Sequence, residues 1–566
     1  DVVPQTSGDT SGAMTAPKLD ARLPRWPIVT VGLSLAIMLG CAIWVTVLSD
    51  SFQYGSDQMS RPLPLLGILA GVAFVAHLVA LWAGLRLPRC VRWTTLWFVA
   101  ALVLRGVLWF SHPIQEVDLY RYLWDGAVVT QGISPYRYSP DSVLSLPATN
   151  SEAEPIKRLL DRPGLAQVHA RVHFPELTTV YPPVSQAVFA ITAWCVPSDA
   201  DVLTHVRAMK AVILLFDIAV LWFLTHWLVR AGLHPAWSIA YGWCPLVLKE
   251  YANSGHLDSI AVFFVVVGLA MLSPRQWIGG DAVPIVSRPR LIGSAVAVGF
   301  GVGAKLFPIV LFPLICVLVT RRNGIRGVVI WSAVALLTTT ITLFPMTFSQ
   351  PASIETEDAT DAPLPASGLK VFLSRWEMND LLFMVVQENL RPEGSIPGQP
   401  SLWFAVTSDD WRTRFVDGVA RTLSIQRDRV PFAFTRAATT LGFLAWVSWL
   451  GYRVWREPNE FAQASFLTLA WFWLLSPTQN PWYWTWALPL IPFARNRTWL
   501  LVSGCALVYY ARFWFEYHHP QMQWMGSNYE GVAAFDFLVV WIEFAPILLL
   551  LAIGPIVSRL TADGVR

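Results

Sequence analysis

The sequence predicts an all-α polytopic membrane protein, and three observations support this class. Of 566 residues, 54% are hydrophobic and only 14% are charged, whereas about 25% of the residues in an ordinary soluble domain are charged. The chain carries 29 Trp and 31 Phe residues. Apolar stretches long enough to cross ~30 Å of hydrocarbon recur along most of its length. This composition excludes disordered, fibrous and small disulfide-stabilised proteins, and a net charge of +3 gives no reason to expect a nucleic-acid partner.

We expect about fourteen membrane-spanning helices, each built on an apolar window of suitable length. Several windows are short or contain proline, as at Pro308 and Pro489. The six cysteines have no paired spacing, so neither a zinc site nor a disulfide framework is predicted. The expected spans are 27–49, 63–86, 91–111, 204–230, 235–252, 259–273, 291–306, 307–320, 327–346, 432–454, 460–476, 483–494, 498–514 and 534–558.

The spans divide the chain into six regions. The first residues are polar and lack the apolar core and cleavage site of a secretory signal, so they are expected to form a disordered cytoplasmic tail. Two segments between spans are long enough to build structure outside the membrane. The predicted regions are the tail (1–26), three spans (27–111), a first large loop (112–203), a membrane core (204–346), a second large loop (347–431) and the C-terminal spans (432–566).

The orientation follows from basic residues, which concentrate in cytoplasmic loops of membrane proteins. Every second short loop of this chain is basic, so both large loops are expected to face outward. The only Asn-X-Ser/Thr pattern begins at Asn496, in a predicted cytoplasmic loop, which favours a bacterial plasma or inner membrane. The basic residues are Lys18, Arg22, Arg25, Arg86, Arg89, Arg92, Arg275, Arg288, Arg290, Arg321, Arg322, Arg326, Arg453, Arg456, Arg495 and Arg497.

The first outward loop begins with a cluster of carboxylates at the end of an apolar helix. Asp118, Arg121 and Asp125 recur at helical spacing and share one face, which predicts an amphipathic helix lying on the bilayer. The alternative is an Asp N-cap followed by a solvated helix face. We interpret the apolar stretch 182–197 as a second surface helix, because a crossing there would reverse the alternation of basic loops.

Two further polar positions interrupt the apolar core. Asn253 to Asp258 forms a turn that holds His256 and Asp258 beside Lys249 and Glu250. Lys305 ends one apolar span and directly precedes another, on the outward side where lysine is disfavoured. A charge so close to hydrocarbon indicates a functional site. The alternatives are an ordinary polar turn and a lysine that snorkels to the interface.

Later outward segments add aromatic and charged residues to the same membrane face. They are Arg375 to Asp380, Ser476 to Trp484, and Arg512 with Glu516 to His519. Carboxylates can move protons, cations can bind phosphate and aromatic rings can stack on sugars. This combination suits a lipid that carries a sugar phosphate.

At these residues the chain resembles the GT-C superfamily of integral-membrane glycosyltransferases, which use polyprenyl-phosphate-linked sugars. Asp118 to Tyr136 resembles the first outward loop of the catalytic subunit of GPI mannosyltransferase I and of bacterial polyprenyl-phosphate-mannose-dependent α-mannosyltransferases. Gly255 to Asp258 resembles a turn of the bacterial enzymes, and Lys305 to Pro308 resembles the Lys-X-X-Pro turn of both groups. Asn480 to Tyr483 occupies the place of their late aromatic turn. Two additional spans before the first outward loop depart from the pattern.

The resemblance implies a GT-C fold with Asp118 as the catalytic base. One carboxylate suffices for an inverting transfer, since phosphate is a good leaving group, whereas glycosidases need a paired acid. Lys305, with Arg375 or Arg512, is expected to bind the donor phosphate. Glu116, Asp118 and Asp258 could share a divalent ion, but the resemblance favours a site without metal or other cofactor. Further substrate contacts are expected from Glu116, Tyr120, Arg121, Asp125, His256, Asp258, Trp376, Glu377, Asn379, Asn480, Trp482, Tyr483 and His518.

The predicted function is transfer of a sugar, mannose by the resemblance, from a polyprenyl-phosphate donor to a glycolipid or glycan acceptor outside the cytoplasmic membrane. Membrane lipids are the other expected partners. The alternative is a sugar or polyprenyl-lipid transporter or flippase, which predicts polar residues at mid-membrane depth and repeated broken helices. Asp217 and His226 lie within one span, but no repeat is evident. Asp118 and Lys305 argue against a third reading, a catalytically silent scaffold.

Overall fold

The computed structural model describes residues 25–145, 154–273, 284–349, 368–395, 402–518, 521, 523 and 527–563. In the described part every regular element is a helix, and only two isolated β-bridges occur beside the turns and loops, which confirms the predicted all-α class. The helices outside the site are α1 (Arg25–Leu48), α2 (Leu63–Gly84), α3 (Val91–Trp109), α9 (Val202–Arg230), α13 (Arg288–Ala304), α14 (Phe312–Phe348), α18 (Val430–Arg456), α19 (Phe461–Leu474), α21 (Trp499–Cys505), α22 (Ala511–His518), α23 (Gly531–Ala534) and α24 (Val540–Asp563).

Seven helical stretches in the described ranges are long and apolar enough to cross a membrane. Six of them agree closely with single predicted spans, as α9 does with 204–230 and α18 with 432–454. The seventh, Phe307–Phe348, covers the two predicted spans 307–320 and 327–346, which meet at a kink where Gly324 has a φ of 70°. The other predicted spans fall on shorter or interrupted helices, so the count of about fourteen stays a prediction. The seven are Arg25–Phe52, Leu63–Gly84, Val91–Trp109, Val202–Arg230, Phe307–Phe348, Arg427–Arg456 and Gly531–Ile553.

The predicted span 235–252 is not one continuous helix. It consists of η3 (Pro235–Ser238), α10 (Ile239–Gly242), α11 (Pro245–Val247) and the π-helix η4 (Leu248–Asn253). Pro245 cannot donate a backbone hydrogen bond to the preceding turn, so the helix restarts there. π-Helical turns are often found at functional sites. This one leads directly into the turn that carries His256.

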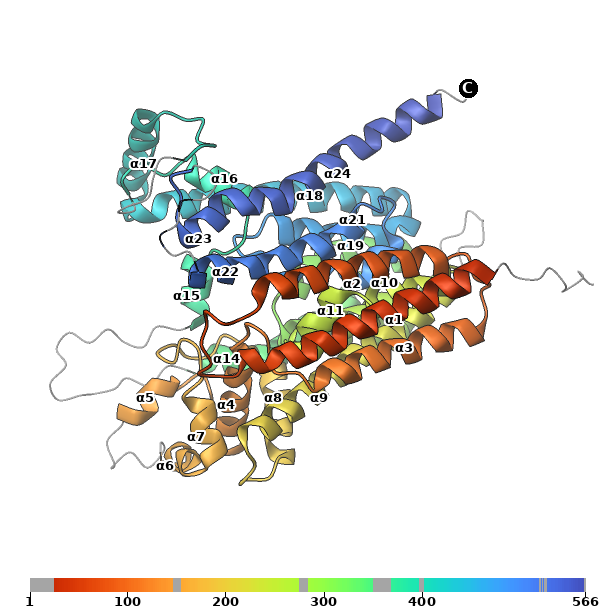
Figure 1. The fold of residues 1–566 in the computed structure, drawn as a ribbon. Helices are drawn as coiled ribbons and strands as arrows, with labels where there is room; N and C mark the ends of the chain where they lie inside the picture. Colours follow the sequence, from red (N-terminus) through yellow and green to blue (C-terminus); the bar gives the residue numbers. More distant parts are fainter. Residues whose placement is uncertain are drawn as a thin grey trace, which may run out of the picture.

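The two large loops lie at the same end of the helix bundle, as Figure 1 shows for α5 to α7 and for α15 to α17. Their helices are α4 (Asp118–Thr130), α5 (Pro140–Ser145), α6 (Glu154–Lys157), α7 (Pro163–His169) and α8 (Pro183–Cys195), followed by α15 (Gly368–Arg375), α16 (Leu382–Glu388) and α17 (Asp409–Leu423). The loops also touch directly. The rings of Phe174 and Trp376 are 4.9 Å apart, and the Gly368 N–H donates to Thr178 Oγ1.

Several of the basic loops meet one another away from the large loops. Glu460 forms ion pairs with Arg453 and with Arg495, the latter at 2.6 Å. Arg321 Nε donates to the Trp455 carbonyl at 3.3 Å. Loops that were predicted to share one membrane face therefore contact each other.

The helix that begins at Asp118 forms as predicted, but its polar face is not solvated. Every residue of α4 from Leu119 to Val128 is buried. The helix packs against α8, and Gly126 allows this approach because a Cβ there would lie 2.5 Å from the Phe189 carbonyl oxygen. With 13 residues, α8 spans only ~20 Å at 1.5 Å per residue, less than the ~30 Å hydrocarbon core.

A buried ion pair explains the charge inside α9. Asp217 lies 2.6 Å from Arg105 of α3, and both side chains are at most 2% exposed. The Tyr241 hydroxyl donates to Asp217 at 2.7 Å, and Arg105 also donates to the Gly242 carbonyl. The carboxylate thereby connects α3, α9 and α10. His226 faces the exterior of the bundle, where its ring nitrogen contacts the Trp222 carbonyl.

Candidate active site

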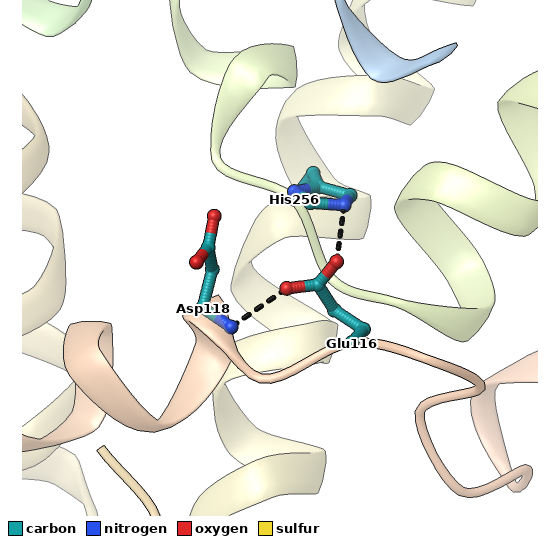
Figure 2. A group of neighbouring side chains, drawn as sticks. All are labelled: Glu116, Asp118 and His256. Atoms are coloured by element: carbon teal, nitrogen blue, oxygen red, sulfur yellow. Dashed lines mark hydrogen bonds and ion pairs between the residues drawn. The ribbon is translucent and has the colours of Figure 1, made fainter. Parts of the chain in front are cut away.

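Glu116, Asp118 and His256 lie close together, and Glu116 bonds to both of the others (Figure 2). Glu116 and Asp118 flank the start of α4, and His256 lies in the turn between η4 and α12 (Asp258–Leu272). One ligand-type atom from each residue lies within 4.8 Å of the others. Residues 138 or more positions apart in the chain thus form one cluster, as the sequence motifs predicted.

The carboxylate of Glu116 holds the first turn of α4. Its Oε1 accepts the backbone N–H groups of Val117 and Asp118 at 2.9 and 2.6 Å. Val117 occupies the N-cap position, and Asp118 is the first helical residue. The N-cap alternative for Asp118 is therefore wrong, which leaves its side chain free for another role.

Asp118 is a half-buried carboxylate with an unusual proton affinity. Burial and then the negative charge of Glu116 raise its pKa to about 6, against the lowering effects of His256, Lys305 and the Tyr181 hydroxyl. A base with a pKa close to neutral can accept a proton and release it again during turnover. This property suits the role predicted for Asp118.

His256 is a buried cation between two carboxylates. It is 1% exposed, and its Nε2 lies 2.8 Å from Glu116 Oε2 and 3.3 Å from Glu250 Oε2. Burial opposes its charge, but Glu116 and Glu250 raise the pKa of His256 to about 10. In turn, His256 keeps the pKa of Glu116 below its usual value despite burial. The ring stacks on Trp482 at 4.2 Å.

A second ion pair lies beside this cluster. Lys305 Nζ is 2.6 Å from Asp258 Oδ1, and the Trp486 indole N–H donates to the same oxygen at 2.5 Å. The ammonium group also lies 4.4 Å from the centre of the Tyr483 ring. Asp258 is buried, whereas 17% of the Lys305 side chain is exposed. The ammonium group of Lys305 therefore lies at the site as one half of an ion pair with Asp258.

The late aromatic turn is joined to the second large loop through backbone bonds. The Met378 N–H donates to the Pro477 carbonyl, and the Gln479 N–H donates to the Met378 carbonyl, both at 2.9 Å. α20 (Pro481–Trp484) begins directly after Asn480. Trp482 stacks on His256 and Tyr483 lies beside Lys305. Asn379 instead donates to Glu543, and Trp376 contacts Phe174.

Other predicted site residues are engaged elsewhere. Arg121 lies 3.9 Å from Asp125, and both are buried. Asp125 also accepts from Gln186 Nε2 at 2.9 Å, and burial raises its pKa. Tyr120 contacts Arg171. The contacts of Arg121 and Asp125 hold α4 in place.

The remaining predicted cations and polar residues of the later segments have partners of their own. Arg512 pairs with Asp536 at 3.4 Å, and His518 contacts the Met59 carbonyl. Glu377 accepts two hydrogen bonds of 2.7 Å from Gln387. Arg375 ends α15, and its side chain lies outside the described residues.

Three partners in the site were not among the predicted site residues. Glu250 is fully buried, accepts from the Tyr510 hydroxyl at 2.7 Å and faces His256. Tyr181 and Trp486 act on Asp118 and Asp258, respectively. Glu250 was visible in the sequence as a charge beside the polar turn, whereas nothing marked the two aromatic residues among so many others.

The cluster of Glu116, Asp118 and His256 has the residue types of a divalent-metal site. A ligating histidine must be neutral, but His256 is held as a cation by two carboxylates. A metal ion at this cluster would have to displace the proton of His256. Asp258, the third predicted ligand, is engaged by Lys305 and Trp486.

Comparison with known proteins identifies the family of this chain. No curated protein and no solved structure is similar at a significant level. The family model of the alpha-(1→6)-mannopyranosyltransferase N-terminal domain (MptA_B family) matches residues 30–321. This range covers more than half of the chain and includes Glu116, Asp118, His256 and Lys305. The protein therefore belongs to the alpha-(1→6)-mannopyranosyltransferase family of mannosyltransferases, and its apolar helices make it a membrane protein.

Proposed function

We propose that this mannosyltransferase takes mannose from a polyprenyl-phosphate-linked donor and transfers it to a glycolipid or glycan acceptor at the outer face of the cytoplasmic membrane. The observation that carries the proposal is the half-buried carboxylate of Asp118, whose pKa is raised to about 6 beside the buried Glu116 and His256 pair. The basic loops meet away from this site, and basic loops are typically cytoplasmic.

In the proposed reaction, Asp118 accepts the proton of an acceptor hydroxyl as the oxygen attacks the anomeric carbon of mannose. The bond between that carbon and the phosphate oxygen breaks, and polyprenyl phosphate leaves with the electron pair. Attack from the opposite side inverts the configuration. General-base assistance of this kind contributes ~10²- to 10⁴-fold.

Lys305 is the proposed partner of the departing phosphate. Its ammonium group is partly exposed and is fixed by Asp258 at 2.6 Å and by the Tyr483 ring. A positioned cation stabilises negative charge that develops on the leaving group. Since His256 is already charged by its carboxylate partners, we propose that the reaction needs no divalent metal.

A transporter gains no support from the charge in α9, because Arg105 and Tyr241 already account for Asp217. The decisive experiment is transfer by the purified protein in lipid nanodiscs, with radiolabelled polyprenyl-phosphate mannose and short mannosides as acceptors. Nucleoside-diphosphate mannose is the control donor. We expect product only with the lipid donor, and at least ~10²-fold slower turnover for Asp118→Asn. Use of the nucleotide donor, or normal turnover by the variant, would refute the proposal.

A further inference from the structure

The turn between α1 and α2, residues 49–62, lies against the first large loop. Ser49 Oγ accepts the backbone N–H of His112 at 2.9 Å, and the Tyr54 hydroxyl donates to the Ala170 carbonyl at 3.0 Å. Asp50 lies 3.6 Å from the His112 ring. The turn therefore borders the first large loop beside the site.

Two arginines converge on this turn without a carboxylate partner. The guanidinium of Arg171 lies 4.8 Å from the Tyr54 ring and 5.4 Å from the Tyr120 ring. That of Arg207 lies 5.9 Å from the ring of Phe110, two residues before His112. Within the described part of the chain, neither arginine forms an ion pair, and the buried Nε of Arg207 has no hydrogen-bond acceptor.

Three cations and one carboxylate act on the His112 ring. Burial lowers the pKa of His112, Asp50 raises it, and the nearby cations Lys210, Arg207 and Arg171 lower it further. Asp50 is 72% exposed, so water screens its charge. Among the described residues, Arg171 and Arg207 have no carboxylate partner, and the Nε–H group of Arg207 has no acceptor. Such arginines form a suitable site for a phosphate group.

A shallow apolar groove on the surface of the bundle ends at Phe110, beside Arg207. It lies between α1 and α3, has a volume of about 530 Å³ and is lined by residues that include Ile43, Val47, Val103 and Phe110. Gly106 carries no side chain that would fill it. Phe110 lines the groove and also contacts Arg207, so an acyl or prenyl chain in the groove would place its phosphate beside the arginine.

This site is separate from Lys305. The strongest charge effects on Asp118 come from Glu116, His256 and Lys305. A phosphate that leaves the reacting mannose must lie near the base, which fits Lys305. The cations at the α1–α2 turn fit a phosphate that lies farther from the reacting hydroxyl. A lipid-anchored acceptor has this form when sugar residues separate the phosphate of its lipid anchor from the hydroxyl that receives mannose.

We propose that His112, Arg171 and Arg207 bind the anchor phosphate of a membrane-bound glycolipid acceptor, whose lipid chain lies in the groove between α1 and α3. The proposal rests on the mannosyl transfer proposed above and adds the acceptor's class and position. It assigns the hairpin of α1 and α2 a role in choosing the acceptor.

The test compares two acceptors with the same mannose head, a phosphate-linked lipid mannoside and a neutral alkyl mannoside. Arg171→Gln and Arg207→Gln each remove one cation. We expect each variant to raise KM for the phosphate-linked acceptor about tenfold, the usual effect of one lost charge-assisted hydrogen bond. KM for the neutral acceptor and for the donor should stay unchanged. Arg158→Gln is the control, because Arg158 is 67% exposed and pairs with Glu154.

Other results would overturn either this assignment or the proposed function. Equal losses with both acceptors, or a raised KM for the donor, would overturn the assignment of this site. So would a wild-type enzyme that uses only the neutral acceptor. Normal turnover of the neutral acceptor by both variants shows that they are folded. A wild-type enzyme that transfers to neither acceptor would instead refute the proposed function.

Discussion

The ammonium group of Lys305 lies 2.6 Å from Oδ1 of Asp258, and the two residues enter the site as a pair. Asp258 begins α12, whereas Lys305 directly follows α13. The pair therefore joins the ends of two helices at the site. It also fixes the position of the cation that we assign to the donor phosphate.

Lys305→Gln should weaken donor binding and also destabilise the protein. The substitution leaves the buried Asp258 carboxylate without its cation, and breaking a buried pair on one side costs about 3 kcal/mol. Lys305→Gln with Asp258→Asn removes both charges, so it should recover most of the thermal stability while the raised donor KM persists. Thermal unfolding in detergent and donor titrations separate these effects. Full recovery of donor affinity in the double variant would reassign Lys305 to a structural role.

The pH dependence of turnover should report Asp118. Its pKa is raised to about 6, so the carboxylate is protonated and inactive as a base below that value. We expect kcat/KM to fall about tenfold for each pH unit below 6. Glu116→Gln removes one of the charges that raise this pKa, so the acid limb should move to lower pH. A limb that stays in place would show that another group controls it.

Protein stability should depend on pH through His256. The folded protein raises the pKa of His256 from 6.5 to about 10, so this contribution is fully present below about 6.5 and is lost as the pH rises toward 10. His256→Gln should be destabilised near neutral pH, because Glu116 and Glu250 then remain buried without a cation. The variant should also lose the decline between pH 6.5 and 10. Denaturation midpoints measured across this range test both statements.

Chelation tests the proposed absence of a metal. We expect the enzyme to keep its activity after treatment with EDTA and passage over a metal-free column. Loss of activity that Mg²⁺ or Mn²⁺ restores would show that Glu116, Asp118 and His256 hold an ion in place of the His256 proton. Glu250→Gln is informative in that case, since it weakens the ion pair without touching the three candidate ligands.

The sequence predicted those parts of the fold that depend on the residues of a single helix. The long spans and the helix start at Asp118 follow from local apolar windows and from helix periodicity. The interruption at Pro245 was harder to predict, because the window 235–252 is apolar throughout and the short helices are stabilised by their neighbours.

The sequence pointed to Glu116, Asp118, His256 and Lys305, but it did not show how these residues pair. Glu116 and His256 lie far apart in the sequence, and only tertiary packing places Glu250 on the other side of the imidazole. The periodicity of Arg121 and Asp125 indicated one shared face, but it could not show that α8 covers the helix. Buried polar residues and solvated ones have the same spacing on a helix.

The last prediction concerns the side of the membrane on which the site lies. Cys90 is exposed in a basic loop between α2 and α3, and Asp199 is exposed in the first large loop. Because basic loops are retained in the cytoplasm, Asp199→Cys should react with an impermeant thiol reagent in intact cells, whereas Cys90 should react only after permeabilisation. Asp199→Cys is combined with Cys195→Ser, so that the neighbouring thiol of Cys195 does not react in its place. Cys90→Ser shows which part of the labelling comes from Cys90. Labelling of Cys90 in intact cells, with Asp199→Cys protected, would invert the orientation and place mannosyl transfer on the cytoplasmic side.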